Sequence, residues 1–100
     1  MLDLRLSSND SHAALGGELV FGNHAEFREM VRRLVASDAQ RLVVDFTDLE
    51  FIDSAGLGML LLLRQEANLA NRRVVLRNAR RQVKRMFEVS RFDTLFTLEP

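Results

Sequence analysis

An aspartate and a serine lie together at the centre of the chain, within the segment Phe51–Gly58. Ser54 follows a strand-like run at residues 42–46 and precedes the apolar run Leu57–Leu63. Its hydroxyl is therefore expected at the joint between a buried strand and the first turn of a buried helix. Free N–H groups and the positive end of the helix dipole attract anions at such a joint, so a phosphate would be stabilised there. We interpret Ser54 as the centre of function.

A structural interpretation of the same residues is also available. Serine is a preferred helix N-cap, so Ser54 could simply cap the helix that follows. Asp53 could cap that helix or brace the loop. Gly56 and Gly58 would allow either the close approach of a partner or tight packing of the helix start on the sheet.

Catalytic and metal chemistry find little support in the sequence. The only imidazoles, His12 and His24, precede Ser54 by 30 residues or more, and the serine does not lie in a Gly-x-Ser-x-Gly elbow. The chain has no cysteine, and no His, Asp and Glu residues have the spacing of a metal site. We therefore expect no enzymatic activity, no metal and no cofactor.

Length and composition indicate one globular domain, residues 1–100, because 47% of the chain is hydrophobic. The net charge is zero, but residues 1–50 hold five Arg against nine acids, and residues 51–100 hold nine Arg or Lys against five acids. The basic residues gather in one region: Arg72, Arg73, Arg77, Arg80, Arg81, Lys84 and Arg85. Such a region could bind nucleic acid, but a solvated helix face is favoured, since the chain lacks Tyr, Trp and a phosphate-binding glycine loop.

Two features of the sequence, its first residues and its longest apolar run, indicate where in the cell the protein is expected. The amino terminus lacks the basic and apolar segments of a signal peptide. Residues 57–63 are too few to span a bilayer, which requires about 20 apolar residues. We expect a cytoplasmic protein that does not insert into a membrane.

Hydrophobic periodicity predicts an α/β domain with the order β-β-α-β-α-β-α-β. Strands are expected at residues 2–6, 12–21, 41–46, 73–76 and 95–98, and helices at residues 24–37, 55–70 and 79–88. The first two strands should form a hairpin, and the remaining β-α-β units should form a mostly parallel sheet. The apolar run at residues 42–46 favours a strand covered on both faces.

Local signals refine these elements. Gly16-Gly17 predicts a bulge or a bend in the second strand. Asn23, with Glu26 three residues later, predicts the start of the first helix, and Asn78 is expected to cap the third. Residues 47–50 are interpreted as a turn. The expected core includes Phe27, Val31, Val44, Leu60, Leu61 and Val75.

The segment Val44–Gly58, which reads VDFTDLEFIDSAGLG, resembles the signature of the STAS domain, the anti-sigma factor antagonist family. The resemblance is specific in the strand, in the spacing to Asp53-Ser54, in Gly56-Leu57-Gly58 and in the apolar helix. The order of elements over the whole chain agrees, with weak matching outside residues 16–76.

The resemblance implies a bacterial phosphoprotein of signal transduction and transcription regulation that acts by partner switching. A serine kinase of the histidine-kinase-like fold, which is also the anti-sigma factor, would phosphorylate Ser54, and a PP2C-type phosphatase would reverse this. The unphosphorylated protein would bind the kinase. The partner-binding residues would be Asp53, Ser54, Ala55, Gly56, Leu57 and Gly58.

Two alternatives remain within the same resemblance. One is an accessory subunit of a transporter or another complex that is not phosphorylated. It is favoured by Val20, which stands where family members often carry an acidic residue. The other is a module that binds a small ligand or nucleotide.

Overall fold

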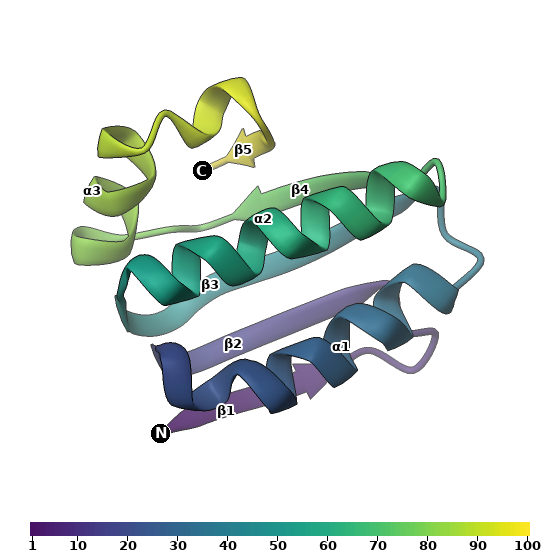
Figure 1. Cartoon of the computed structure of the whole chain (residues 1–100), viewed down its shortest axis with the longest axis horizontal. Helices are drawn as coiled ribbons and strands as arrows, with labels where there is room; N and C mark the ends of the chain where they lie inside the picture. Colours follow the sequence, from purple (N-terminus) through teal and green to yellow (C-terminus); the bar gives the residue numbers. More distant parts are fainter.

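A five-stranded sheet carries the helices on one of its faces in the computed structural model, which describes all residues 1–100 (Figure 1). The strands are β1 (Leu2–Leu6), β2 (His12–Leu19), β3 (Arg41–Ile52), β4 (Arg73–Arg77) and β5 (Thr97–Glu99). The α-helices are α1 (His24–Ala36), α2 (Ser54–Leu69) and α3 (Arg81–Val89), and the short 3₁₀ helices are η1 (Phe21–Asn23) and η2 (Phe92–Thr94). The predicted order of strands and helices is confirmed.

The strands lie in the sheet in the same order as in the chain, β1-β2-β3-β4-β5. β1 and β2 form the predicted antiparallel hairpin, and each later strand is parallel to its neighbour. The mixed, mostly parallel sheet is therefore confirmed. Because β2, β3 and β4 are parallel, the segments that follow them leave the sheet at the same edge.

Only one face of the sheet is covered by helices, which corrects the expectation of two covered faces. Leu42, Val44 and Phe46 of β3 join side chains of all three helices in one hydrophobic core. Val43 and Asp45 alternate with them and point to the opposite face. Val43 is nevertheless buried. It pairs with Val75 of β4, and the pairs on either side of it, Arg41 with Arg73 and Asp45 with Arg77, are charged residues. A strand with one open face thus carries a continuous apolar run.

The third strand is twice as long as predicted, because residues 47–50 continue it instead of turning. They pair with β2, from the pair Gly16 and Asp48 to the pair Leu19 and Ile52. The pairing of β2 with β3 continues across two register shifts, which lie on either side of Gly16-Gly17, and Gly17 has a φ of 81°. The bulge predicted at Gly16-Gly17 is confirmed, and it lets β3 extend as far as the joint with α2.

Helix α2 is less buried than its composition suggested. Leu61 is 41% exposed, so its place in the predicted core is wrong, whereas Phe27, Val31, Val44, Leu60 and Val75 are all buried. The reason is geometric: α2 packs on one face of the sheet and beside α1, so one side of the helix faces solvent (Figure 1).

The boundaries of three other elements differ from the prediction. β2 ends at Leu19, because Val20 leads into η1. α3 begins at Arg81 with Arg80 as N-cap, so Asn78 does not cap it. Asn78 has a φ of 62°, and its amide nitrogen donates to the Asp45 carboxylate at 3.1 Å. The last strand begins at Thr97, since residues 92–94 form η2.

Candidate functional site

Ser54 is the first residue of α2 and is exposed at the edge of the sheet where β3 ends. The helix cap is Asp53, whose carboxylate accepts a hydrogen bond from the Gly56 N–H at 2.7 Å. The Ser54 hydroxyl forms no hydrogen bond within the protein. The interpretation of Ser54 as the cap is therefore wrong, and that of Asp53 as the cap is confirmed. The hydroxyl is free for other chemistry at the positive end of the helix.

The two glycines of α2 have different roles. A Cβ atom on Gly56 would clash with the Leu19 carbonyl oxygen and would lie 2.6 Å from Cγ1 of Ile52. Gly56 therefore allows the helix to pack tightly against β2 and β3. Gly58 is exposed, and a Cβ atom there would meet nothing within 4 Å. Gly58 leaves the helix surface near Ser54 open to solvent.

The joint between β3 and α2 is held by a glutamine of another helix. The side-chain amide of Gln82, in α3, donates to the Ile52 carbonyl at 2.8 Å and accepts from the Ile52 N–H at 3.0 Å. β4 pairs with β3 only as far as Asp45, so no strand is available to hydrogen-bond the backbone N–H and carbonyl of Ile52 on this side. Nothing in the sequence marked Gln82, because the periodicity of a short helix does not show where an amide side chain will lie.

The end of β2 lies beside this joint, because Leu19 pairs with Ile52. The Asp53 N–H donates to the Leu19 carbonyl at 3.4 Å. Phe21, two residues after Leu19, is 71% exposed, and its ring stacks on His24 with 5.8 Å between the centroids. His24 thus belongs to an exposed aromatic pair at the end of the sheet where Ser54 lies.

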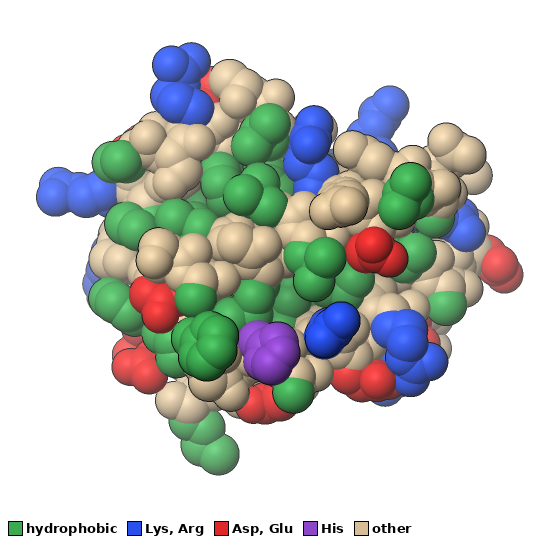
Figure 2. Space-filling model, viewed as in Figure 1, with side chains coloured by type: hydrophobic (Ala, Val, Ile, Leu, Met, Phe, Trp, Pro, Cys, Tyr) green, Lys and Arg blue, Asp and Glu red, His purple; other side chains and the backbone are tan.

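The six residues of the predicted partner-binding segment do not form one exposed patch. Ser54 and Gly58 are exposed, Asp53 and Ala55 are half-buried, and Gly56 and Leu57 are buried. Beyond this segment, Leu61 on α2 and Val89 on α3 expose 41% and 74% of their surface. Hydrophobic side chains gather over the first half of α2 and toward α3 on this face of the molecule (Figure 2). Uncharged side chains thus form much of the surface that continues from Ser54 along α2.

Asp45 is the centre of a polar network on the open face of the sheet. Thr47 donates to its carboxylate through the backbone N–H at 2.7 Å and the hydroxyl at 2.6 Å, and Asn78 donates to the other oxygen. Burial raises the pKa of Asp45, but these hydrogen bonds and the charge of Arg77 outweigh it and hold the pKa below its ordinary value. The network links the middle of β3 to the residue that follows β4.

The basic region of the second half is divided among several places. Arg77 forms an ion pair with Glu99 at 3.0 Å on the open face of the sheet. Arg80 and Arg81 lie at the start of α3, whereas Arg72 and Arg73 lie at the opposite ends of the strands, where β4 begins. The structure therefore does not bring these residues into one basic surface.

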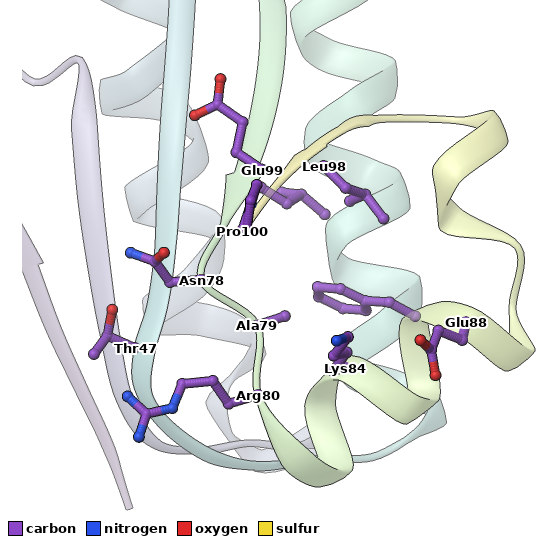
Figure 3. Close-up of a pocket in the computed structure, with 11 residues that line it drawn as sticks. Thr47, Asn78, Ala79, Arg80, Lys84, Glu88, Leu98, Glu99 and Pro100 are labelled. Atoms are coloured by element: carbon purple, nitrogen blue, oxygen red, sulfur yellow. The ribbon is translucent and has the colours of Figure 1, made fainter.

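The largest hollow of the protein, about 660 Å³, lies at the carboxyl ends of β4 and β5 and does not include Ser54 (Figure 3). Its apolar lining comes from Leu76, Ala79, Phe87 and Leu98, and polar side chains that include Thr47, Asn78 and Lys84 surround it. Ligands of open parallel sheets bind at this end of the strands. Sequence analysis did not anticipate this hollow, because it depends on how α3 and β5 pack.

The comparisons with known proteins agree with this geometry. The family model of the STAS domain matches residues 4–100, and the chain belongs to this family. It is 39% identical over 82 residues to a STAS-domain containing protein of Pseudomonas aeruginosa (strain UCBPP-PA14), covering 82% of this chain and 80% of the relative.

Solved structures share the fold at low sequence identity. An anti-sigma factor antagonist from Mycobacterium paratuberculosis has a TM-score of 0.78 at 21% identity, covering 100% of this chain and 86% of the other. The phosphorylated form of SpoIIAA, a Bacillus cell fate determinant, has a TM-score of 0.68 at 19% identity, covering 98% of this chain and 90% of the other. The fold is therefore that of anti-sigma factor antagonists.

Two further features bear on the kind of site. No group of three or more His, Cys, Asp or Glu side chains is arranged to hold a metal ion. No helix of the chain is long and apolar enough to cross a bilayer.

Proposed function

We propose that this protein is a phosphorylation-switched regulatory binding protein of the anti-sigma factor antagonist type. In its unphosphorylated state it binds a serine kinase of the histidine-kinase-like fold that also serves as an anti-sigma factor. That kinase transfers phosphate to Ser54 and so ends the association, and a PP2C-type phosphatase restores the binding state. The protein acts by association and needs no cofactor.

The observation that carries this proposal is the free Ser54 hydroxyl at the first position of α2. It is exposed and forms no hydrogen bond, because Asp53 caps the helix in its place. The Ser54 hydroxyl is therefore accessible to a kinase, and no hydrogen bond within the protein has to break before it can act as a nucleophile. The similarity in fold to a protein solved in a phosphorylated form adds support.

The surroundings of Ser54 explain how one modification would abolish binding. Phosphorylation adds a charge of about −1.5 to −2. Gly58 and the half-exposed Leu61 lie further along α2. A partner that binds there would bury the phosphate against uncharged groups. Desolvating the phosphate beside Asp53 would cost several kcal/mol, and about 1.4 kcal/mol corresponds to tenfold in affinity. The fold itself need not change.

The test is phosphorylation by candidate kinases encoded in the same genome, read by intact mass and by mapping the modified residue. We expect a gain of one phosphate, at Ser54, in the wild type and none in Ser54→Ala. Ser7, Ser8, Ser11, Ser37 and Ser90 serve as internal controls, since none lies at a helix start behind a buried strand. Phosphate at one of these serines, with Ser54 unmodified, would contradict the assignment.

A second candidate function is favoured by the hollow at the carboxyl ends of β4 and β5 (Figure 3). Its apolar floor and polar rim are typical of a small-ligand site, so a ligand-binding module remains the principal alternative. An accessory subunit that is never phosphorylated is the other, and it is favoured only by Val20 in place of an acid. Protein isolated from its own cells without phosphate, and carrying a small molecule, would favour the ligand-binding alternative.

A further inference from the structure

A hollow of about 540 Å³ is lined by residues next to the starts of β3 and β4. These strands begin at the end of the sheet that lies opposite the start of α2 (Figure 1). The six lining residues of the hollow are all polar, and three of them are arginines: Gln40, Arg41, Asn68, Asn71, Arg72 and Arg73. None of the six is acidic or hydrophobic. We propose that this hollow, which we call the arginine hollow, binds a small, multiply charged anion such as a phosphate or pyrophosphate group.

The charge of the arginine hollow is largely uncompensated. Of its three arginines, only Arg41 takes part in an ion pair, with Glu99. Arg72 and Arg73 appear in none of the eight ion pairs of the protein. Two neighbouring cations without a counter-ion repel one another, and an anion placed between them removes that repulsion.

Arg72 has hydrogen-bonding capacity that the protein does not use. Its guanidinium donates once within the chain, from Nη1 to the Ala39 carbonyl at 3.0 Å. Its Nε is the single buried side-chain nitrogen or oxygen of the protein without a partner. A guanidinium has five N–H donors in a planar fork that fits phosphate oxygens, so an anion would pair with the donors that remain free on Nη1 and Nη2.

The backbone that carries these arginines is fixed before any ligand arrives. The Arg72 N–H donates to the Ala67 carbonyl, and the Arg73 N–H donates to the Gln40 carbonyl, both at 2.8 Å. Asn71 has a φ of 59°, the left-handed conformation that asparagine tolerates, and it turns the chain from α2 into β4. Binding an anion would therefore require ordering of side chains only.

The lining also limits the kind of ligand. Recognition of a nucleobase or another ring relies on apolar or aromatic surface, and the arginine hollow offers none. The side-chain amides of Gln40, Asn68 and Asn71 add neutral donors around the arginines. This combination favours a compact anion over a nucleotide. The site is separate from Ser54, so it does not depend on the proposed phosphorylation.

The test is calorimetric titration of the full chain with pyrophosphate, and with inorganic phosphate, at low ionic strength. The informative variant is Arg72→Gln with Arg73→Gln. The matched control is Arg80→Gln with Arg81→Gln, which removes the same charge at the start of α3. We expect wild type and control to bind pyrophosphate alike, and the Arg72/Arg73 variant to bind at least about tenfold more weakly, because charge-assisted contacts are lost. Absence of wild-type binding at millimolar pyrophosphate, or a difference between the two variants below tenfold, would overturn the proposal.

Two additions keep the result interpretable. If the Arg72/Arg73 variant does not fold, the single variants Arg73→Gln and Arg81→Gln are compared in the same titration. Arg73→Gln is expected to fold, because Arg73 is exposed and its side chain forms no hydrogen bond. A parallel titration with a single-stranded oligonucleotide tests the macromolecular source of phosphate. Tighter binding of the oligonucleotide than of pyrophosphate, through the same arginines, would indicate a nucleic-acid surface and would also overturn the proposal.

Discussion

The side-chain amide of Gln82 forms with Ile52 the two hydrogen bonds that a neighbouring strand would form. The pairing of β3 with β4 ends at Asp45, so no strand lies beside Ile52 on that side of β3. Ile52 is fully buried and immediately precedes Asp53, the cap of α2. Helix α3 thus fixes the place where Ser54 is presented, although Gln82 does not touch the serine.

Gln82→Ala should destabilise the fold by about 1–3 kcal/mol, because two buried backbone groups lose their partner. Amide hydrogen exchange should accelerate selectively around Ile52 and Gly56, and denaturant unfolding gives the free energy. The control is Gln40→Ala, which removes a glutamine at the other end of β3. Equal exchange rates near Ile52 in the two variants would show that the amide is not needed to hold the joint.

Alanine substitution should have opposite effects at the two glycines of α2. Gly56→Ala should cost about 1–3 kcal/mol or more, since its Cβ atom meets the Leu19 backbone. Gly58→Ala should be neutral or stabilise by up to about 1 kcal/mol, because alanine favours helix and the site is open. Thermal unfolding of both variants measures the difference. Similar melting temperatures would mean that the close approach of α2 to β2 is not maintained in solution.

Substitutions of Ser54 should separate stability from binding. Ser54→Ala should change unfolding little, because the hydroxyl forms no hydrogen bond, and it should keep partner binding. Ser54→Asp should not destabilise the fold, since an acid in the first turn is favoured by about 0.3–1 kcal/mol. It should nevertheless weaken binding to the candidate kinase at least about tenfold. Tighter binding of Ser54→Asp than of Ser54→Ala would contradict the off-switch and would indicate a partner that recognises the phosphorylated serine.

Acid should remove the stabilisation that Asp45 provides. Its pKa is lowered in the folded state, so its contribution is present above the ordinary aspartate pKa and is lost as the pH falls through the lowered value. The difference in unfolding free energy between wild type and Asp45→Asn should therefore be constant near neutral pH and shrink under strongly acidic conditions. A difference that persists at the lowest pH at which both proteins fold would assign the effect to hydrogen bonds that asparagine cannot form, and not to the charge of the carboxylate.

Local sequence patterns were enough to predict the order of the elements, the N-terminal hairpin and most of the core. These follow from local periodicity, from turn residues such as Gly16-Gly17 and from the apolar faces of helices, and each of these signals lies within a few neighbouring residues. The exposed position of Ser54 at the start of α2 followed in the same way, from a strand pattern that ends just before an apolar helix.

The contacts that hold the joint, and the surface around it, become visible only in the folded molecule. Asp53 caps α2 in place of Ser54, Gln82 reaches Ile52 from 30 residues away, and residues 47–50 extend β3 instead of turning. The arginine hollow forms because the turn before β4 lies beside the start of β3. Apart from the local cap, each of these depends on contacts between segments distant in the chain. A local pattern carries no information about which backbone groups a neighbouring strand will leave without a partner.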